Sequence, residues 1–115
     1  MATYDNLPVY KDNYDLLLII FDMVKKFEKQ YKYTLWDKMK NGVIELFSSI
    51  YKANSSFEDR LKNIKKAREQ LEILRIYTRL CKDLKTINIK KYADISLKIE
   101  SLSKQLFAWE KSTKK

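Results

Sequence analysis

The sequence of 115 residues contains no histidine and only one residue each of cysteine, glycine and proline. Without histidine, the chain lacks the Ser-His-Asp and Cys-His catalytic sets, the commonest general base and the Cys/His zinc sites. A single cysteine cannot form an internal disulfide. A single glycine excludes the glycine-rich loops that bind phosphates and dinucleotides. Composition alone therefore excludes most familiar classes of enzyme, and we predict no catalytic residues, cofactor, metal site or small-molecule substrate.

The scarcity of glycine and proline also bears on the fold. Hairpins and sandwiches need tight turns, whereas long helices joined by short polar connections need few of them. Apolar residues make up 45% of the chain, which is too many for a disordered protein. No apolar run approaches the roughly 18 residues of a membrane span, and the acidic N-terminal segment is wrong for a signal peptide. We predict one all-α domain, in the cytoplasm and without a membrane partner.

Charge is distributed unevenly along the chain. There are 24 Lys and Arg against 15 Asp and Glu, a net charge of +9. Residues 1–22 carry a net charge of −3, residues 23–91 carry +10 and residues 92–115 carry +2. A basic middle section favours a polyanion or an acidic protein surface as partner, although a solvated lysine-rich surface explains the composition equally well.

Apolar residues recur at three- and four-residue steps in four segments, which is typical of helices that share one core. Candidate N-caps precede three of these segments, at Thr34, Ser56 and Asn88. With short connections between them, the segments predict an antiparallel up-down-up-down four-helix bundle. Residues 1–9 then form an N-terminal extension and residues 111–115 a frayed tail. The predicted helices span residues 10–31, 35–53, 57–85 and 89–110.

Two of the predicted helices are apolar over more of their circumference than one core requires. The run LLLIIF at residues 16–21 covers the first helix almost all the way round, and a second apolar stripe follows the C-terminal half of the third helix. We predict that these surfaces also contact a neighbouring subunit. For the first helix, a central position within a monomer is the alternative. The candidate subunit-interface residues are Leu16, Ile19, Ile20, Ile73, Tyr77 and Leu80.

Three of the four arginines and one lysine fall within about 60° of one another on the predicted helix 57–85. Arginine is favoured where phosphate or carboxylate is bound by two parallel hydrogen bonds. This basic stripe is therefore either a docking site for nucleic acid or an acidic protein, or a set of ion pairs with Glu69, Glu72 or Asp83. The basic stripe consists of Arg68, Arg75, Arg79 and Lys82.

A second group of basic residues closes the first predicted helix and has tyrosines between its members. Such an arrangement can follow a nucleic-acid backbone and stack its bases. The alternative, which the pattern favours somewhat, is that lysine near a helix C-terminus simply stabilises the helix dipole. The group consists of Lys25, Lys26, Lys29 and Lys32.

Several segments, in this order and spacing, resemble the accessory variability determinant (Avd) proteins of diversity-generating retroelements, and the likeness extends over residues 7–110. The chain departs from the usual pattern of that family at Glu28, Trp36 and the pair Phe107-Ala108. The segments are residues 27–35 (FEKQYKYTL), 71–80 (LEILRIYTRL), 82–84 (KDL), 87–92 (INIKKY) and 104–109 (KQLFAW).

The resemblance implies a four-helix bundle that assembles into a homopentameric barrel and catalyses nothing. It implies binding to the reverse transcriptase of the element and to nucleic acid, the template RNA or cDNA, in support of mutagenic retrohoming. By transfer, Arg75 and Arg79 are the residues expected to dock this partner. The alternative is a general RNA-binding or ribosome-associated four-helix protein of the sister group, the ribosomal-RNA intervening-sequence proteins. A small nuclease is the third and least supported class.

Overall fold

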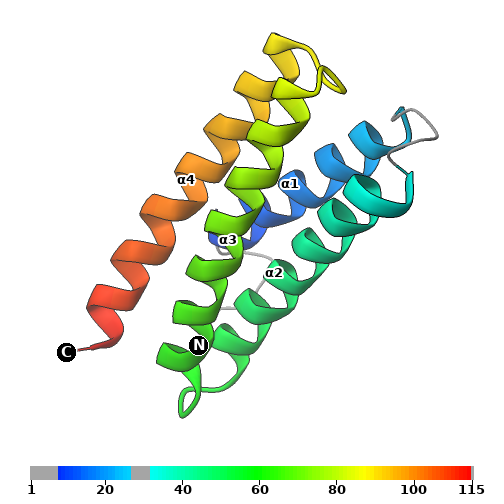
Figure 1. Ribbon diagram of the computed structural model, residues 1–115. Coiled ribbons are helices and arrows are strands. Elements are labelled where there is room, and N and C mark those ends of the chain that lie inside the picture. The colour runs from blue at the N-terminus through cyan, green and yellow to red at the C-terminus, as the bar shows by residue number, and fades with distance from the viewer. Residues whose placement is uncertain (1–7, 27–31, 115) are drawn as a thin grey trace.

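The computed structural model describes residues 8–26 and 32–114, and for residues 32 and 33 it describes the backbone alone. These two segments form four α-helices and contain no strand, so the predicted all-α four-helix fold is confirmed (Figure 1). None of the helices in these segments is long and apolar enough to cross a membrane. The elements are α1 (Pro8–Val24), the π-helical turn η3 (Lys32–Trp36), α2 (Asp37–Ser55), α3 (Arg60–Asp83) and α4 (Ile89–Thr113).

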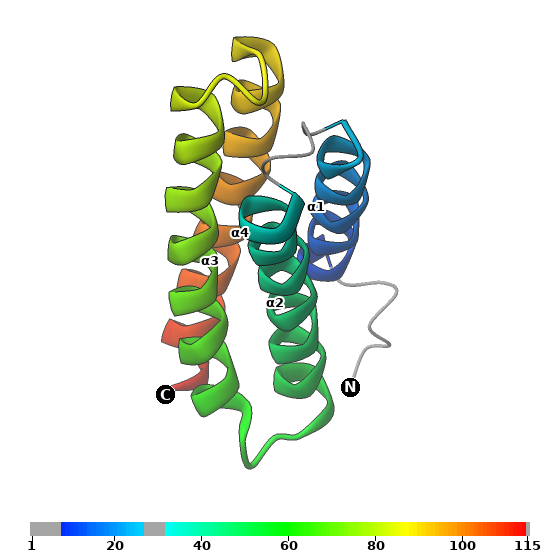
Figure 2. The same cartoon turned by 45° about the vertical axis from the view of Figure 1, so that its right-hand side comes forward.

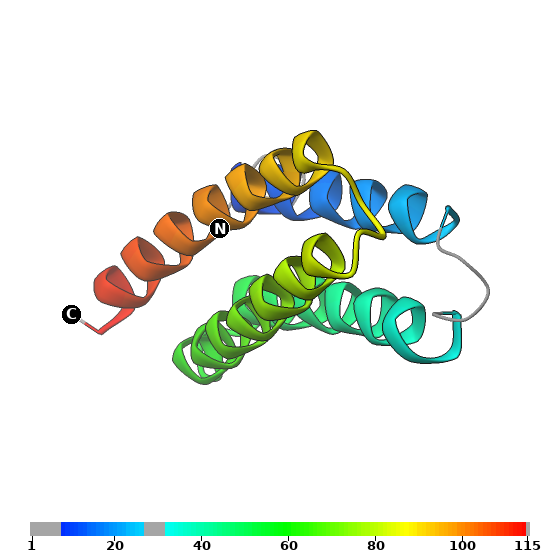
Figure 3. The same ribbon diagram turned by 45° about the horizontal axis from the view of Figure 1, so that its top comes forward.

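Each helix packs against two others: α1 against α2, α2 against α3, α3 against α4, and α4 against α1. Figure 2 shows this antiparallel alternation from the side. Seen from above, α1 and α4 form one layer and α2 and α3 the other (Figure 3). The C-terminal end of α1, the N-terminal end of α2 and the α3–α4 turn therefore lie at the same end of the bundle.

The helix boundaries differ from the prediction by two residues or more everywhere except at the start of α4. α1 begins at Pro8, because proline is tolerated in a first turn where its missing N–H has no role. It ends at Val24, and residues 27–31 of the predicted helix lie outside the described segments. Thr34 is not an N-cap, since it lies within η3, and α2 follows Trp36 without a side-chain cap. α4 continues to Thr113 rather than ending at residue 110.

Only the start of α4 carries its predicted cap, because α3 begins at Arg60 rather than residue 57 and its N-cap, Asp59, makes no side-chain capping bond. Asn88 caps α4 by accepting a hydrogen bond from the backbone N–H of Lys91 at 2.8 Å. The hydroxyl oxygen of Ser56 accepts one from the N–H of Asp59 at 3.3 Å, just before α3. Arg60, the first residue of α3, donates from its guanidinium to the carbonyl oxygens of residues 53 and 54, at 2.8 and 3.2 Å. It thereby satisfies carbonyls that the end of α2 leaves without helical partners.

The interior is built from one face of each helix. On α3 and α4 the buried faces are the predicted stripes, including Leu71, Leu74 and Ile99. On α1 the buried face includes Leu16 and Ile20, which have no exposed surface at all. The prediction that these two residues contact a neighbouring subunit is therefore wrong, because the core of their own chain already surrounds them.

Among the polar side chains buried in this interior, Asn13 stands out because its amide group is unpaired. Asn13 on α1 has no exposed surface, and neither its amide nitrogen nor its amide oxygen has a hydrogen-bond partner among the described residues. A buried donor or acceptor left unpaired costs about 1–3 kcal/mol. Asn13 therefore lowers the stability of the bundle.

Candidate docking surfaces

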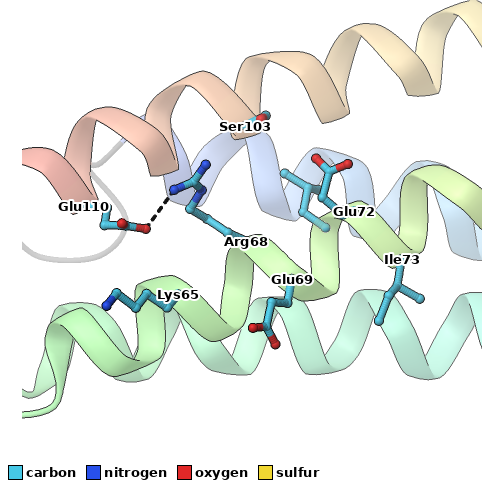
Figure 4. A pocket seen from close by; sticks show the side chains of 8 residues that line it. Lys65, Arg68, Glu69, Glu72, Ile73, Ser103 and Glu110 are labelled. Carbon is cyan, nitrogen blue, oxygen red and sulfur yellow. Dashed lines mark hydrogen bonds and ion pairs between the residues drawn. The ribbon is translucent and has the colours of Figure 1, made fainter.

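The first half of the basic stripe is held by carboxylates of α4. Arg68 donates from Nη1 to Oε1 of Glu110 at 2.9 Å, as Figure 4 shows. Arg75 donates from Nη1 to Oε2 of Glu100 at 2.9 Å, and its Nε lies 3.3 Å from Oε2 of Glu72. The hydrogen bond to Glu100 is the main reason that the pKa of Arg75 is raised. Both arginines thus join α3 to α4 and are largely neutralised there.

An open groove lies beside Arg68 and is lined by residues of both α3 and α4 (Figure 4). Its charged lining consists of two cations, Lys65 and Arg68, and three carboxylates, Glu69, Glu72 and Glu110. A net negative lining repels phosphate groups. This groove is therefore unsuited to a polyanion.

The second half of the basic stripe is only weakly paired, with the side chain of Arg79 mostly exposed and that of Lys82 33% exposed. The side chain of Arg79 is 74% exposed, and its Nε lies 3.9 Å from a carboxylate oxygen of Asp83. Lys82 approaches the same carboxylate at 3.9 Å, and its Nζ lies 4.7 Å from the centre of the Tyr92 ring. Exposed ion pairs contribute about 0–1 kcal/mol. Arg79 and Lys82 are therefore the members of the basic stripe that remain available to a partner.

The lysines that follow α1 are only partly described. Lys25 and Lys26 are exposed, and Lys26 lies 3.7 Å from the exposed carboxylate of Asp22. Lys29 and the side chain of Lys32 lie outside the described part of the structure. Because the end of α1 and the α3–α4 turn share one end of the bundle, Lys25 and Lys26 lie at the same end as Arg79 (Figure 3). Their role in binding stays a prediction.

The single chain also exposes two apolar faces, and exposed apolar patches of this kind mark contact sites. Of the candidate interface residues, Ile73 and Leu80 are accessible, whereas Ile19 and Tyr77 are partly buried against the core. What we call the α3 face consists of Ile73, Ile76, Leu80 and Leu84, with exposed fractions of 41–67%. What we call the α1–α2 face consists of Tyr14, Leu18, Ile44 and Tyr51, each about half exposed.

A polar cluster joins α1 to α4 on another side of the bundle. Asp12 accepts hydrogen bonds from the hydroxyl of Ser101 at 2.9 Å and from the amide of Gln105 at 2.6 Å. Lys98 lies 3.6 Å from Asp12 and 3.3 Å from Asp15. Burial by itself would raise the pKa of Asp12, but the two hydrogen bonds and the charge of Lys98 together lower it. The ionised form of Asp12 therefore stabilises the contact between the helices.

Acid is expected to weaken the fold through Asp12 and Glu110. The hydrogen bonds from Arg68 and Lys114 lower the pKa of Glu110, so both carboxyl groups ionise at lower pH in the folded chain than in the unfolded chain. The stability that they contribute is present at neutral pH and is lost as the pH falls through their folded-state pKa values, below about pH 4. Thermal unfolding measured between pH 7 and pH 2 should show this decline.

Two variants separate the effect of Asp12 on the acid-induced fall in Tm from the effects of all other carboxyl groups. Asp12→Asn keeps an oxygen that accepts hydrogen bonds but removes the charge, so Tm should fall less steeply with acid. Asp94→Asn, at an exposed position of α4, should keep the slope of the unaltered protein. Equal slopes in all three proteins would contradict the role assigned to Asp12.

The structure offers little for chemistry at cysteine or metal. Cys81 is fully buried, and burial raises the pKa of its thiol, as expected for an inert core residue. Within residues 8–26 and 32–114, no three Cys, Asp or Glu side chains are placed to hold a metal ion.

The sequence profile of the bAvd-like family matches residues 9–113. No curated protein matches the chain. The matched span extends from the first turn of α1 to the last residue of α4, so it includes all four helices of the bundle. The resemblance to Avd proteins is thereby confirmed, and the chain belongs to the bAvd-like family.

Proposed function

We propose that the protein is a non-catalytic accessory subunit of a diversity-generating retroelement. It binds the reverse transcriptase of that element together with nucleic acid, the template RNA or cDNA, and so supports mutagenic retrohoming. Membership of the bAvd-like family over residues 9–113 carries this proposal. The weak pairing of Arg79 and Lys82 supports it, because it leaves a basic surface for these partners.

We propose further that the protein acts as a homo-oligomer. A closed ring of identical subunits requires two different faces on each subunit, one for each neighbour. The α3 face and the α1–α2 face are two such surfaces, on different helices of one chain. The number of five subunits follows from the resemblance to Avd proteins alone.

Docking of the reverse transcriptase is tested by comparing Arg79→Ala with Arg75→Ala, a matched change one helical turn earlier. In co-expression with the tagged transcriptase of the same element, the unaltered protein should be retained on the tag. Arg79→Ala should reduce retention about tenfold or more with no change in Tm, since a lost charge-assisted hydrogen bond costs about 1.5–3 kcal/mol. Arg75→Ala should instead lower Tm, because it leaves Glu100 without its partner.

The other outcomes are equally informative. If the unaltered protein is not retained by the transcriptase but binds RNA alone, it is a general RNA-binding bundle and the accessory function is wrong. If Arg79→Ala is retained in full, the transcriptase docks elsewhere. If Arg79→Ala unfolds the bundle, the exposed guanidinium has a structural role that its position at 3.9 Å from Asp83 does not suggest.

A further inference from the structure

Basic side chains gather where α3 turns into α4. Residues 79–94 contain five bases and only two acids, Asp83 and Asp94, so this segment has a net charge of +3. The C-terminal end of α1, which Lys25 and Lys26 follow directly in the sequence, lies at the same end of the bundle (Figure 1). The five bases, which we call the turn cluster, are Arg79, Lys82, Lys85, Lys90 and Lys91.

The backbone of the turn places two of these lysines on one cavity. Lys85 has a φ of 61°, a left-handed conformation that is uncommon for residues with a side chain and that reverses the chain after α3. Lys82 and Lys85 line an open cavity together with the turn residues up to Ile89. Asp83 is the single carboxylate on this lining, and its contacts to Arg79 and Lys82 are exposed and long, at 3.9 Å. The cavity is therefore positively charged.

The turn cluster differs from the rest of the basic stripe in how its charge is balanced. Arg68 and Arg75 each meet a carboxylate of α4 at 2.9 Å. By contrast, Lys85, Lys90 and Lys91 form no ion pair with any residue that the structure describes, and Lys85 and Lys90 are exposed. An unneutralised cluster attracts polyanions, whereas an internally paired one does not.

Flat and apolar groups accompany this charge. The ring of Tyr92 lies under the ammonium group of Lys82, and the side chain of Ile89 is largely exposed beside the cavity. Lysines that follow a backbone beside aromatic and apolar surface are typical of single-strand binding, in which phosphates meet the charge and bases stack. At the N-terminus of α4, the N–H of Lys91 is already donated to the side chain of Asn88.

We infer that the α3–α4 turn binds the phosphate backbone of single-stranded nucleic acid, with Lys82, Lys85 and Lys90 on successive phosphates. The inference rests on the proposed function and assigns the nucleic-acid contact to a place on the bundle. The groove beside Arg68 is another opening on α3, and its three carboxylates exclude it from this role.

The test compares two double variants of equal net charge. Lys85→Gln with Lys90→Gln alters the turn, and Lys62→Gln with Lys66→Gln alters two exposed lysines at the opposite end of α3. Binding to a fluorescent 20-nucleotide oligouridine is followed by anisotropy over a range of salt concentrations. For the turn variant, the slope of log affinity against log salt should fall by about 1.4, at 0.7 per phosphate contact, and affinity should fall about tenfold in dilute salt. The control should stay near the unaltered protein.

Each other result overturns a different statement. Equal weakening by both double variants means that the whole surface attracts RNA and that the turn is not a site. A turn variant that binds RNA normally but no longer retains the reverse transcriptase makes the turn a protein-docking surface. Absence of RNA binding by the unaltered protein overturns the proposed nucleic-acid function itself. Circular dichroism checks that the variants are folded. If the double variant unfolds, the single variants Lys85→Gln and Lys90→Gln replace it, and each should lower the slope of log affinity against log salt by about 0.7.

Discussion

A chain that carries both Ile73→Asp and Leu80→Asp is expected to be a monomer that keeps its helical content. Both side chains lie on the α3 face, 52% and 41% exposed, so the aspartates remain hydrated in a single folded chain. In an assembly they would be buried without partners, and an uncompensated buried charge destabilises by several kcal/mol. Light scattering should show a fall from about five times 13.8 kDa to 13.8 kDa.

The matched control for this variant is Leu97→Asp on α4. Leu97 is 71% exposed and belongs to neither apolar face, so its substitution should leave the mass unchanged. An unaltered protein that is monomeric at both low and high salt would refute the proposed assembly. If the assembly survives the double substitution, the α3 face is not the contact. Leu18→Asp would then test the α1–α2 face in the same way.

Replacement of Asn13 by leucine is expected to raise the free energy of unfolding by about 2 kcal/mol. Asn13 is fully buried and its amide group has no partner among the described residues, whereas leucine has the same branching and number of side-chain heavy atoms and no polar atom. Removing an unpaired buried polar group recovers about 1–3 kcal/mol. For a chain of this length, that corresponds to a rise in Tm of roughly 10 °C. Urea denaturation of the isolated protein measures the change directly.

Asn63→Leu provides the comparison for this prediction. The amide of Asn63 donates to the backbone oxygen of Asp59 at 3.1 Å, so the substitution removes a bond that is made and should lower stability slightly. If Asn13→Leu also lowers stability, an internal water forms hydrogen bonds with the amide of Asn13 in solution.

A buried polar residue in a helical bundle can also select one register of packing. Asn13→Leu would then be more stable but less uniquely folded, which broadened amide resonances would reveal.

The core of α3 and α4 was predictable because one apolar stripe runs along most of each helix, and such a stripe indicates which side of the helix faces the interior. The cap at Asn88 was predictable because its bond spans only three residues. α1 was harder. Its apolar residues 16–21 surround the helix, so periodicity alone does not indicate which of them face the core. The structure buries Leu16 and Ile20 and exposes Leu18.

The basic stripe shows the same limit for charged residues. Its spacing on one helix follows from the sequence, since 100° per residue places Arg75 and Arg79 close together in angle. The ion-pair partners of Arg68 and Arg75 cannot be predicted from the sequence in the same way, because Glu110 and Glu100 lie 42 and 25 residues away along the chain. Pairing with Glu72 and Asp83 on α3 itself was foreseen, and those are the longer contacts.

The sequence by itself determined the fold class, the family and the excess of positive charge, because periodicity, motif order and composition are properties of the chain. Only the tertiary structure decided where that charge remains unbalanced. Helix packing brings two glutamates of α4 against the first half of the basic stripe and leaves Lys85 and Lys90 at the turn without a carboxylate partner in the described residues. Electrostatic neutralisation depends on distances of a few ångströms, and the packing of distant segments sets those distances.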